Sequence, residues 1–177
     1  MANRHGMKSS SELIDVQIDD IAEGKQIKLR LGNGIAEYGG IIPNDNPDTI
    51  GTYTLEVAPS FRGRAIGEKM MRTLIVEAKR LDLKTFGGHV ESQYALDIRA
   101  RIFGKNALKF FYDGEAGDLD DFPEQYEELP ITFDQARQSL ERSAEYEEDL
   151  EHREYGFSVE VDLSSIDTQS WDEPNRD

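Results

Sequence analysis

The sequence predicts an α+β fold, a mixed and mostly antiparallel central sheet flanked by helices. Residues 25–31 and 156–163 alternate apolar and polar side chains with the two-residue period of a strand. Residues 66–81 and 93–104 instead repeat apolar side chains every three or four positions, as amphipathic helices do. With 177 residues and 37% hydrophobic content, the chain is long enough for one domain with a sizeable core.

The N-terminal 22 residues predict a leader followed by a strand. Residues 1–11 are polar and are expected to be a disordered leader. Residues 12–22 fit two patterns, because Ile14, Val16 and Ile18 alternate like a strand while Ile14, Ile18 and Ile21 share a helical face. We favour the strand.

A hairpin is predicted next. Residues 25–31 form its first strand, and Gly32-Asn33-Gly34 is its turn, because Asn and Gly both accept positive φ. Residues 35–42 return as the partner strand, in which Gly39-Gly40 suggests a bulge.

Residues 52–81 predict a strand, a turn and a helix in succession. Tyr53, Leu55 and Val57 alternate with polar or small neighbours, and Pro59 ends the strand because it has no N–H to donate. The apolar face of the following helix comprises Ile66, Met70, Leu74, Ala78 and Leu81. The turn between them, Arg62 to Gly67, holds two guanidinium groups and small residues. The first N–H groups of a helix attract anions, so this arrangement predicts a phosphate-binding turn.

This segment resembles the coenzyme A motif of the GNAT family of acyl-CoA N-acyltransferases. The family pattern is Arg or Gln, two residues, Gly, one residue, then Gly or Ala. Arg62 and Gly67 match its two ends, while Ala65 stands where the pattern has its middle glycine. The resemblance covers roughly residues 25–112 and the strand at 157–163.

The resemblance implies a GNAT-like sheet, acetyl-CoA or coenzyme A as the cofactor, and N-acetyltransferase activity. It also implies that the backbone N–H of Val57 stabilises negative charge on the thioester oxygen. The cofactor-binding residues that it implies are Leu55, Val57, Arg62, Gly63, Arg64, Ala65, Ile66, Gly67 and Gln93. Members of the family often pair, so a homodimer is also expected.

The chain departs from the family in two places. The family usually has two helices between its first two strands, but here only two residues separate residues 12–22 from residues 25–31. Its acceptor pocket is therefore built differently or left open. Aligned on Gly104, the family's Asn and its Tyr near the thiol correspond to Gln93 and Ala100, and alanine supplies no proton.

The remaining chain predicts a strand at 84–90, a helix at 93–104 with Gly104 as its cap, and a strand at 107–112. An acidic insertion follows at 113–154, with a loop to residue 131 and then a helix from 133 that Thr132 can cap. We expect one domain over residues 12–164, in which residues 156–163 form the last strand. Residues 165–177 are expected to be a frayed tail with Trp171 as an anchor.

Several side chains are candidates for moving the amine's proton. Candidate acids or bases are Glu56, His89, Glu91, Tyr94 and Tyr112. Histidine titrates near neutrality, but a lone strand histidine such as His89 is more often structural. Glu56 also fits a solvated strand carboxylate. Tyr94 and Tyr112 also fit aromatic residues of the core or of its rim. No metal site is expected, since the three histidines are scattered.

Charge is divided unevenly along the chain. Residues 1–112 hold 16 Lys and Arg against 14 Asp and Glu, whereas residues 113–177 hold 4 against 22. The acidic part repels nucleic acid and attracts cations, so we expect no direct nucleic-acid binding. With no cysteine, no membrane span and no signal peptide, a cytoplasmic protein is expected.

Two functions fit this sequence. The first is an acyl-CoA-dependent N-acyltransferase whose acceptor is a cationic small molecule, such as a polyamine, or a basic protein carrying a lysine or N-terminus. The second is a catalytically degenerate acidic module of the same fold that docks a basic or nucleic-acid-binding partner protein. Acidity that serves only solubility or salt adaptation is a third explanation for the charge.

Overall fold

The computed structural model describes residues 13–90, 92–112, 128–145, 157–169 and 171. The predicted leader, Glu91 and most of the acidic insertion, at 113–127 and 146–156, lie outside the described residues. The strands are β1 (Ile14–Ile21), β2 (Gly24–Leu31), β3 (Ala36–Pro43), β4 (Thr49–Thr52), β5 (Glu56–Val57), β6 (Thr85–His89), β7 (Lys109–Tyr112), β8 (Glu128–Leu129) and β9 (Phe157–Asp162). The α-helices are α1 (Ile66–Arg80), α2 (Gln93–Phe103) and α3 (Phe133–Glu145), and short 3-10 turns occupy Pro59–Phe61, Lys105–Ala107 and Leu163–Ser165.

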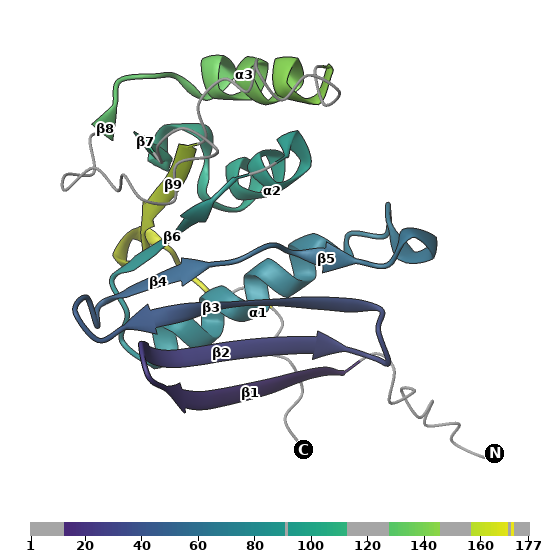
Figure 1. Ribbon diagram of the computed structural model, residues 1–177, viewed down its shortest axis with the longest axis vertical. Helices are drawn as coiled ribbons and strands as arrows, with labels where there is room; N and C mark the ends of the chain where they lie inside the picture. Colours follow the sequence, from purple (N-terminus) through teal and green to yellow (C-terminus); the bar gives the residue numbers. More distant parts are fainter. Residues whose placement is uncertain (1–12, 91, 113–127, 146–156, 170, 172–177) are drawn as a thin grey trace.

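The strands form one sheet in the order β1-β2-β3-β4-β6-β9-β7-β8, with β5 attached to β3 (Figure 1). Only β4 and β6 pair in parallel, and the other pairs are antiparallel. The predicted α+β class with a mostly antiparallel sheet is confirmed. Within residues 12–22, which fitted both a helix and a strand, Ile14–Ile21 form the edge strand β1.

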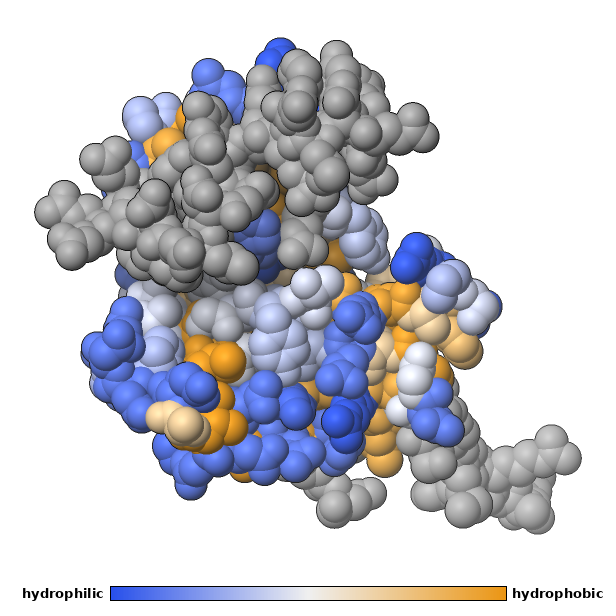
Figure 2. All heavy atoms as spheres, viewed as in Figure 1, coloured by the Kyte–Doolittle hydropathy of each residue, from blue (hydrophilic) through white to orange (hydrophobic). Residues whose placement is uncertain are grey.

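The three described helices lie on one face of the sheet. Phe86 of β6 packs in the core with Met70 and Leu74 of α1, while Val161 of β9 packs in a second cluster with Leu96 of α2 and residues of α3. Phe86 and Val161 are paired directly across β6 and β9, so their side chains share a face. The opposite face of β1 to β3 carries largely hydrophilic side chains, which are visible at the front of Figure 2.

The strand predicted through residues 53–57 is interrupted at residues 53–55, between β4 and β5. Gly40 pairs with Thr52, but Glu37 pairs with Glu56, so residues 53–55 stand opposite only residues 38–39. One extra residue is therefore inserted between β4 and β5, which is a bulge. The bulge predicted within Gly39-Gly40 is wrong, because β3 pairs regularly with β2 through those residues.

Tyr53 explains why a glycine lies opposite this bulge. Its hydroxyl donates to the carbonyl of Ile27 over 3.3 Å, so its ring crosses β3 at Gly39. A Cβ on Gly39 would lie 2.1 Å from the carbonyl oxygen of Ile27 and 2.3 Å from the Tyr53 Oη, both closer than real Cβ atoms approach. The glycine thus provides space for the tyrosine.

Helix ends follow the predicted caps, with two other corrections. The Thr132 hydroxyl accepts from the N–H of Gln135 at 3.2 Å, and Gly104 ends α2 with φ 84°. Leu81, predicted on the buried face of α1, is 39% exposed because it lies past the last helical turn. The predicted loop up to residue 131 contains strand β8, which pairs with β7.

Candidate functional site

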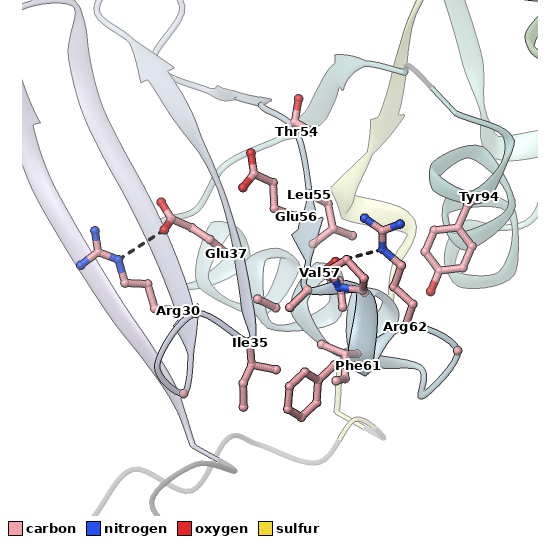
Figure 3. Close-up of a pocket in the computed structure, with 18 of the residues that line it drawn as sticks. Arg30, Ile35, Glu37, Thr54, Leu55, Glu56, Val57, Phe61, Arg62 and Tyr94 are labelled. Carbon is pink, nitrogen blue, oxygen red and sulfur yellow. Dashed lines mark hydrogen bonds and ion pairs between the residues drawn. The ribbon is translucent and has the colours of Figure 1, made fainter. Parts of the chain in front are cut away.

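A cavity of about 1120 Å³ lies beside β5 and the start of α1 (Figure 3). The β2–β3 hairpin forms one wall, β5 and the turn after it form the floor, and the start of α2 forms the other wall. The lining residues are Arg30, Gly32 to Glu37, Thr54 to Pro59, Phe61 to Gly63, Ile66, Gly67, Ser92 and Tyr94.

The cavity exists because two strands part at Thr52. Thr52 and Gly88 are the last pair between β4 and β6, and β5 then pairs with β3 alone. A Cβ on Gly88 would lie 2.3 Å from the Thr52 hydroxyl, so a glycine is needed at this last pair of the two strands. Beyond this point, the edge of β5 that faces away from β3 has no partner strand within the described residues.

Hydrogen-bond alternation assigns the backbone groups on that edge. The N–H of Ala58 donates to the carbonyl of Ile35 on the β3 side at 2.9 Å. Successive residues of an antiparallel strand point their N–H and C=O groups to opposite sides. The N–H and C=O of Val57 therefore face away from β3, toward the cavity.

One side chain already uses this edge. The Nε–H of Arg62 donates to the carbonyl of Val57 at 3.0 Å. Figure 3 shows the guanidinium between β5 and Tyr94, which projects from α2. A positive charge thus lies in the gap beside β5.

The turn before α1 has the shape of an anion site. Gly63 has φ 76° and Ala65, the residue before α1, has φ 58° and ψ 15°, so both lie in the left-handed region. The first bond of α1 runs from the N–H of Lys69 to the carbonyl of Ala65. The N–H groups of the three residues between them have no acceptor within the helix and are directed at its start.

Gly67 brings α1 close to the cavity walls. A Cβ at Gly67 would lie 3.1 Å from Leu55 Cδ2, 3.2 Å from Ile98 Cδ1 and 3.4 Å from Tyr94 Cε1. The helix, the strand and α2 therefore meet where the sequence has no side chain.

Three charged side chains form a row at the other end of the cavity, on the sheet face opposite the helices. Arg30 pairs with Glu37 at 3.6 Å, and Glu37 is directly opposite Glu56. All three line the cavity and are exposed. Burial, followed by the negative charge of Glu37, raises the pKa of the nearby Tyr53 hydroxyl.

The structure brings most of the predicted site residues together, but not all. Leu55, Glu56, Val57, Arg62, Gly63, Ile66, Gly67 and Tyr94 line the cavity. Arg64, Ala65, Gln93 and His89 do not line it. Arg64 stacks on Phe61 at 5.3 Å, and His89 is an exposed residue paired with Ser158 on β9.

Ala100 and Tyr94 occupy different places along α2. Ala100 is partly buried and packs on the second core cluster, whereas Tyr94 is 49% exposed and lies beside Gly67. Tyr94 is therefore at the end of the cavity next to the start of α1.

Sequence reasoning missed part of the lining. Arg30, Glu37 and the hairpin turn reach the cavity only because β5 pairs with β3 in this register. Thr54 and Ser92 were also missed, and no pattern in the sequence marks them. In the described ranges, no cluster of His, Asp and Glu is arranged to hold a metal ion. No described helix is long and apolar enough to cross a membrane.

Comparisons with known proteins are consistent with this geometry. A model of the acetyltransferase (GNAT) family matches residues 9–98, just over half of the chain. No curated protein matches.

Several solved structures resemble the chain at low identity. An acetyltransferase from Bacillus subtilis in complex with CoA is 12% identical, with a TM-score of 0.48, and the match covers 84% of this chain and 98% of that one. An IAA acetyltransferase from Bacillus cereus is 13% identical, with a TM-score of 0.46 and coverage of 84% and 99%. A diaminobutyrate acetyltransferase from Paenibacillus lautus, in complex with its substrate and coenzyme A, is 15% identical, with a TM-score of 0.45 and coverage of 78% and 70%.

Proposed function

Because this chain belongs to the acetyltransferase (GNAT) family, we propose that it transfers the acetyl group of acetyl-CoA to an amine that is cationic in solution. The observation that carries this proposal is the unpaired edge of β5 next to the start of α1. An extended, amide-containing arm can bond to such an edge like an added strand, while a diphosphate is received by a helix start.

The residues present fit such a cofactor. The first N–H groups of α1 have no acceptor within the helix, and Arg62 lines the cavity. Arginine binds phosphate through charge-assisted hydrogen bonds. The cavity is also large enough for a cofactor arm and an acceptor together, since ligand sites typically measure about 300–1,000 Å³.

We assign one task to each of the two residues of β5, Glu56 and Val57. When bound, acetyl-CoA supplies an activated acyl group. The N–H of Val57 faces the cavity and is a fixed donor for negative charge that develops on a carbonyl oxygen. Glu56, the preceding residue, points its side chain to the open sheet face and accepts the proton of the incoming amine, directly or through water.

The charge row favours a cationic acceptor. Arg30 offsets one of the two carboxylates, Glu37, and this leaves the charge of Glu56 to interact with an ammonium group. The 22 acidic residues of the segment 113–177 act in the same direction. A polyamine-like molecule and a protein lysine or N-terminus are the two acceptor forms that this charge suits.

Calorimetry with acetyl-CoA is the direct test, followed by thiol release in the presence of amines. We expect binding in the micromolar range, as is common for enzyme substrates, and thiol release that needs both an amine and the protein. Absence of binding at millimolar acetyl-CoA would remove the proposal.

The Glu56→Gln variant tests the assigned base. We expect kcat to fall roughly 10²- to 10⁴-fold while acetyl-CoA binding stays within about threefold of the wild type, because the lost group moves only a proton. Glu37→Gln is the matched control, since it removes a neighbouring carboxylate from the same row. If both variants lose kcat equally, Glu56 has no special role and the row acts only through its charge.

A further inference from the structure

Arg62 already bonds to the backbone carbonyl of Val57, which the cofactor arm would need as a hydrogen-bond acceptor. Its Nε–H bonds to the carbonyl of Val57, and the alternation along β5 places that carbonyl on the unpaired edge. A carbonyl oxygen has a second lone pair, but the guanidinium also fills space between β5 and Tyr94 (Figure 3). An arm lying along β5 and this position of Arg62 therefore exclude one another.

The backbone of Arg62 is held while its side chain is free to move. The N–H of Arg62 bonds to the carbonyl of Pro59 at 3.3 Å, which fixes the main chain at the end of the 3-10 turn. The side chain is exposed, and exposed side chains change rotamer in picoseconds to nanoseconds. Moving the guanidinium from Val57 to the start of α1 thus needs no refolding of the turn.

A diphosphate is the ligand group that favours this move. The present bond joins a guanidinium to a neutral carbonyl, whereas a bond to phosphate joins two opposite charges and can form two parallel hydrogen bonds at once. Arg64 offers a contrast, because it stacks on Phe61 and does not line the cavity.

We propose that Arg62 is a positioning residue that guards the edge of β5 and is withdrawn by the diphosphate of the cofactor. In the free protein, Arg62 covers the carbonyl of Val57. When a diphosphate binds at the start of α1, Arg62 transfers to it and uncovers the edge for the arm. This inference rests on the proposed function and adds substrate selection by Arg62. A thioester that lacks the diphosphate cannot withdraw Arg62, so the edge of β5 stays covered.

The test compares acetyl-CoA with S-acetylpantetheine, which has the arm and the thioester but no diphosphate. For Arg62→Met, we expect kcat/KM for acetyl-CoA to fall roughly 10- to 100-fold, because a charged hydrogen bond is lost. For S-acetylpantetheine, we expect kcat/KM to rise about two- to fivefold, because the edge is no longer covered. Opposite changes for the two substrates are the signature of the proposal.

Arg64→Met is the matched control, since it removes the same charge two residues away. Because Arg64 does not line the cavity, Arg64→Met should not give opposite changes: any change in kcat/KM should have the same direction for acetyl-CoA and S-acetylpantetheine. Circular dichroism and thermal unfolding confirm that both variants fold. Misfolding would lower the activity with both substrates, so it cannot explain a rise in kcat/KM for S-acetylpantetheine.

Failure of the inference can be distinguished from failure of the proposed function. If the wild type does not bind acetyl-CoA in the calorimeter, the proposed function fails. If the wild type binds and turns over acetyl-CoA but Arg62→Met lowers or leaves unchanged the activity with S-acetylpantetheine, only the guarding role of Arg62 is overturned. If Arg64→Met gives the same opposite changes, the effect is general to charge at this turn, and the role of Arg62 is likewise overturned.

Discussion

At the scale of single residues, Ala65 carries a backbone conformation that suits glycine better. It precedes α1 with φ 58° and ψ 15°, where a Cβ crowds the following carbonyl. Its position matches the middle glycine of the coenzyme A motif. The chain therefore adopts this turn at some cost in stability.

Ala65→Gly should raise the free energy of unfolding by about 0.5–1 kcal/mol. Relief of roughly 1–2 kcal/mol of left-handed strain is partly offset by the greater entropy of glycine in the unfolded chain. Urea denaturation measures the change. Gly63→Ala is the opposite control, since Gly63 has φ 76° and open space around it, and it should destabilise by about 1 kcal/mol. Equal effects from the two variants would show that strain at these positions is not the cause.

At the scale of elements, the sequence identified nearly every strand and helix but not how they meet. Alternation and caps are local signals, so the hairpin, α1, α2 and β9 were predictable. The extra residue at 53–55 was not, because Tyr53, Leu55 and Val57 alternate as they would in an unbroken strand. The interruption depends on the fit of Tyr53 over Gly39, a contact between residues far apart in the chain.

The junction of α1 with the cavity yields a prediction about Gly67. Gly67→Ala gains about 1 kcal/mol of helix propensity, but its Cβ would press on Leu55 and Ile98 and touch Tyr94 at 3.4 Å. Leu55 and Tyr94 line the cavity. We expect stability within about 1 kcal/mol of the wild type, with acetyl-CoA affinity reduced several-fold in calorimetry. Gly51→Ala is the control, because its nearest neighbour would be 3.9 Å away and Gly51 lies outside the cavity. Unchanged affinity in Gly67→Ala would show that these walls adjust freely.

Glu68 ties α1 to α2 and makes their contact depend on pH. It accepts from Arg72 at 2.9 and 3.1 Å and from Arg101 at 3.1 Å. The hydrogen bond from Arg72 is the main cause that lowers the pKa of this carboxyl in the folded protein. Because the folded pKa is below the unfolded one, the stabilisation is present above about pH 4.3 and is lost as the pH falls through the folded value.

Glu68→Gln should therefore be less stable than the wild type at pH 7, and the difference should shrink as the pH falls below about 4. Urea unfolding at several pH values measures it. Glu141→Gln is the control, since Glu141 pairs with Arg137 inside the single helix α3. A difference for Glu68→Gln that stays constant down to pH 3 would contradict the assignment.

At the scale of the whole molecule, the open sheet face and the charge row depend on tertiary register. The short link between residues 12–22 and 25–31 did predict that no helices lie between the first two strands, and β1 and β2 are joined directly. The sequence did not predict that Arg30, Glu37 and Glu56 stand side by side, because that requires knowing which strands are neighbours. His89 was a candidate acid or base because it lies on β6, but it does not line the cavity.

Trp171, the last residue that the structure describes, lies against helix α1. Trp171, the predicted anchor, is partly buried against the main core, and Arg72 lies over its ring at 4.7 Å. Trp171→Ala should lower the free energy of unfolding by about 1–3 kcal/mol through lost burial and cation–π contact. Trp171→Phe keeps a ring and should lose clearly less. Equal stability of the alanine variant and the wild type in urea would mean that the tail contributes nothing.

The gap beyond Thr52 also means that this sheet has an edge in its interior, not only at its two ends. Edges of this kind leave amide hydrogens open to water. Deuterium should therefore enter at Val57 sooner than at Ala58, whose amide is already bonded to Ile35. Whatever ligand completes the sheet will slow the first exchange and leave the second almost as it was.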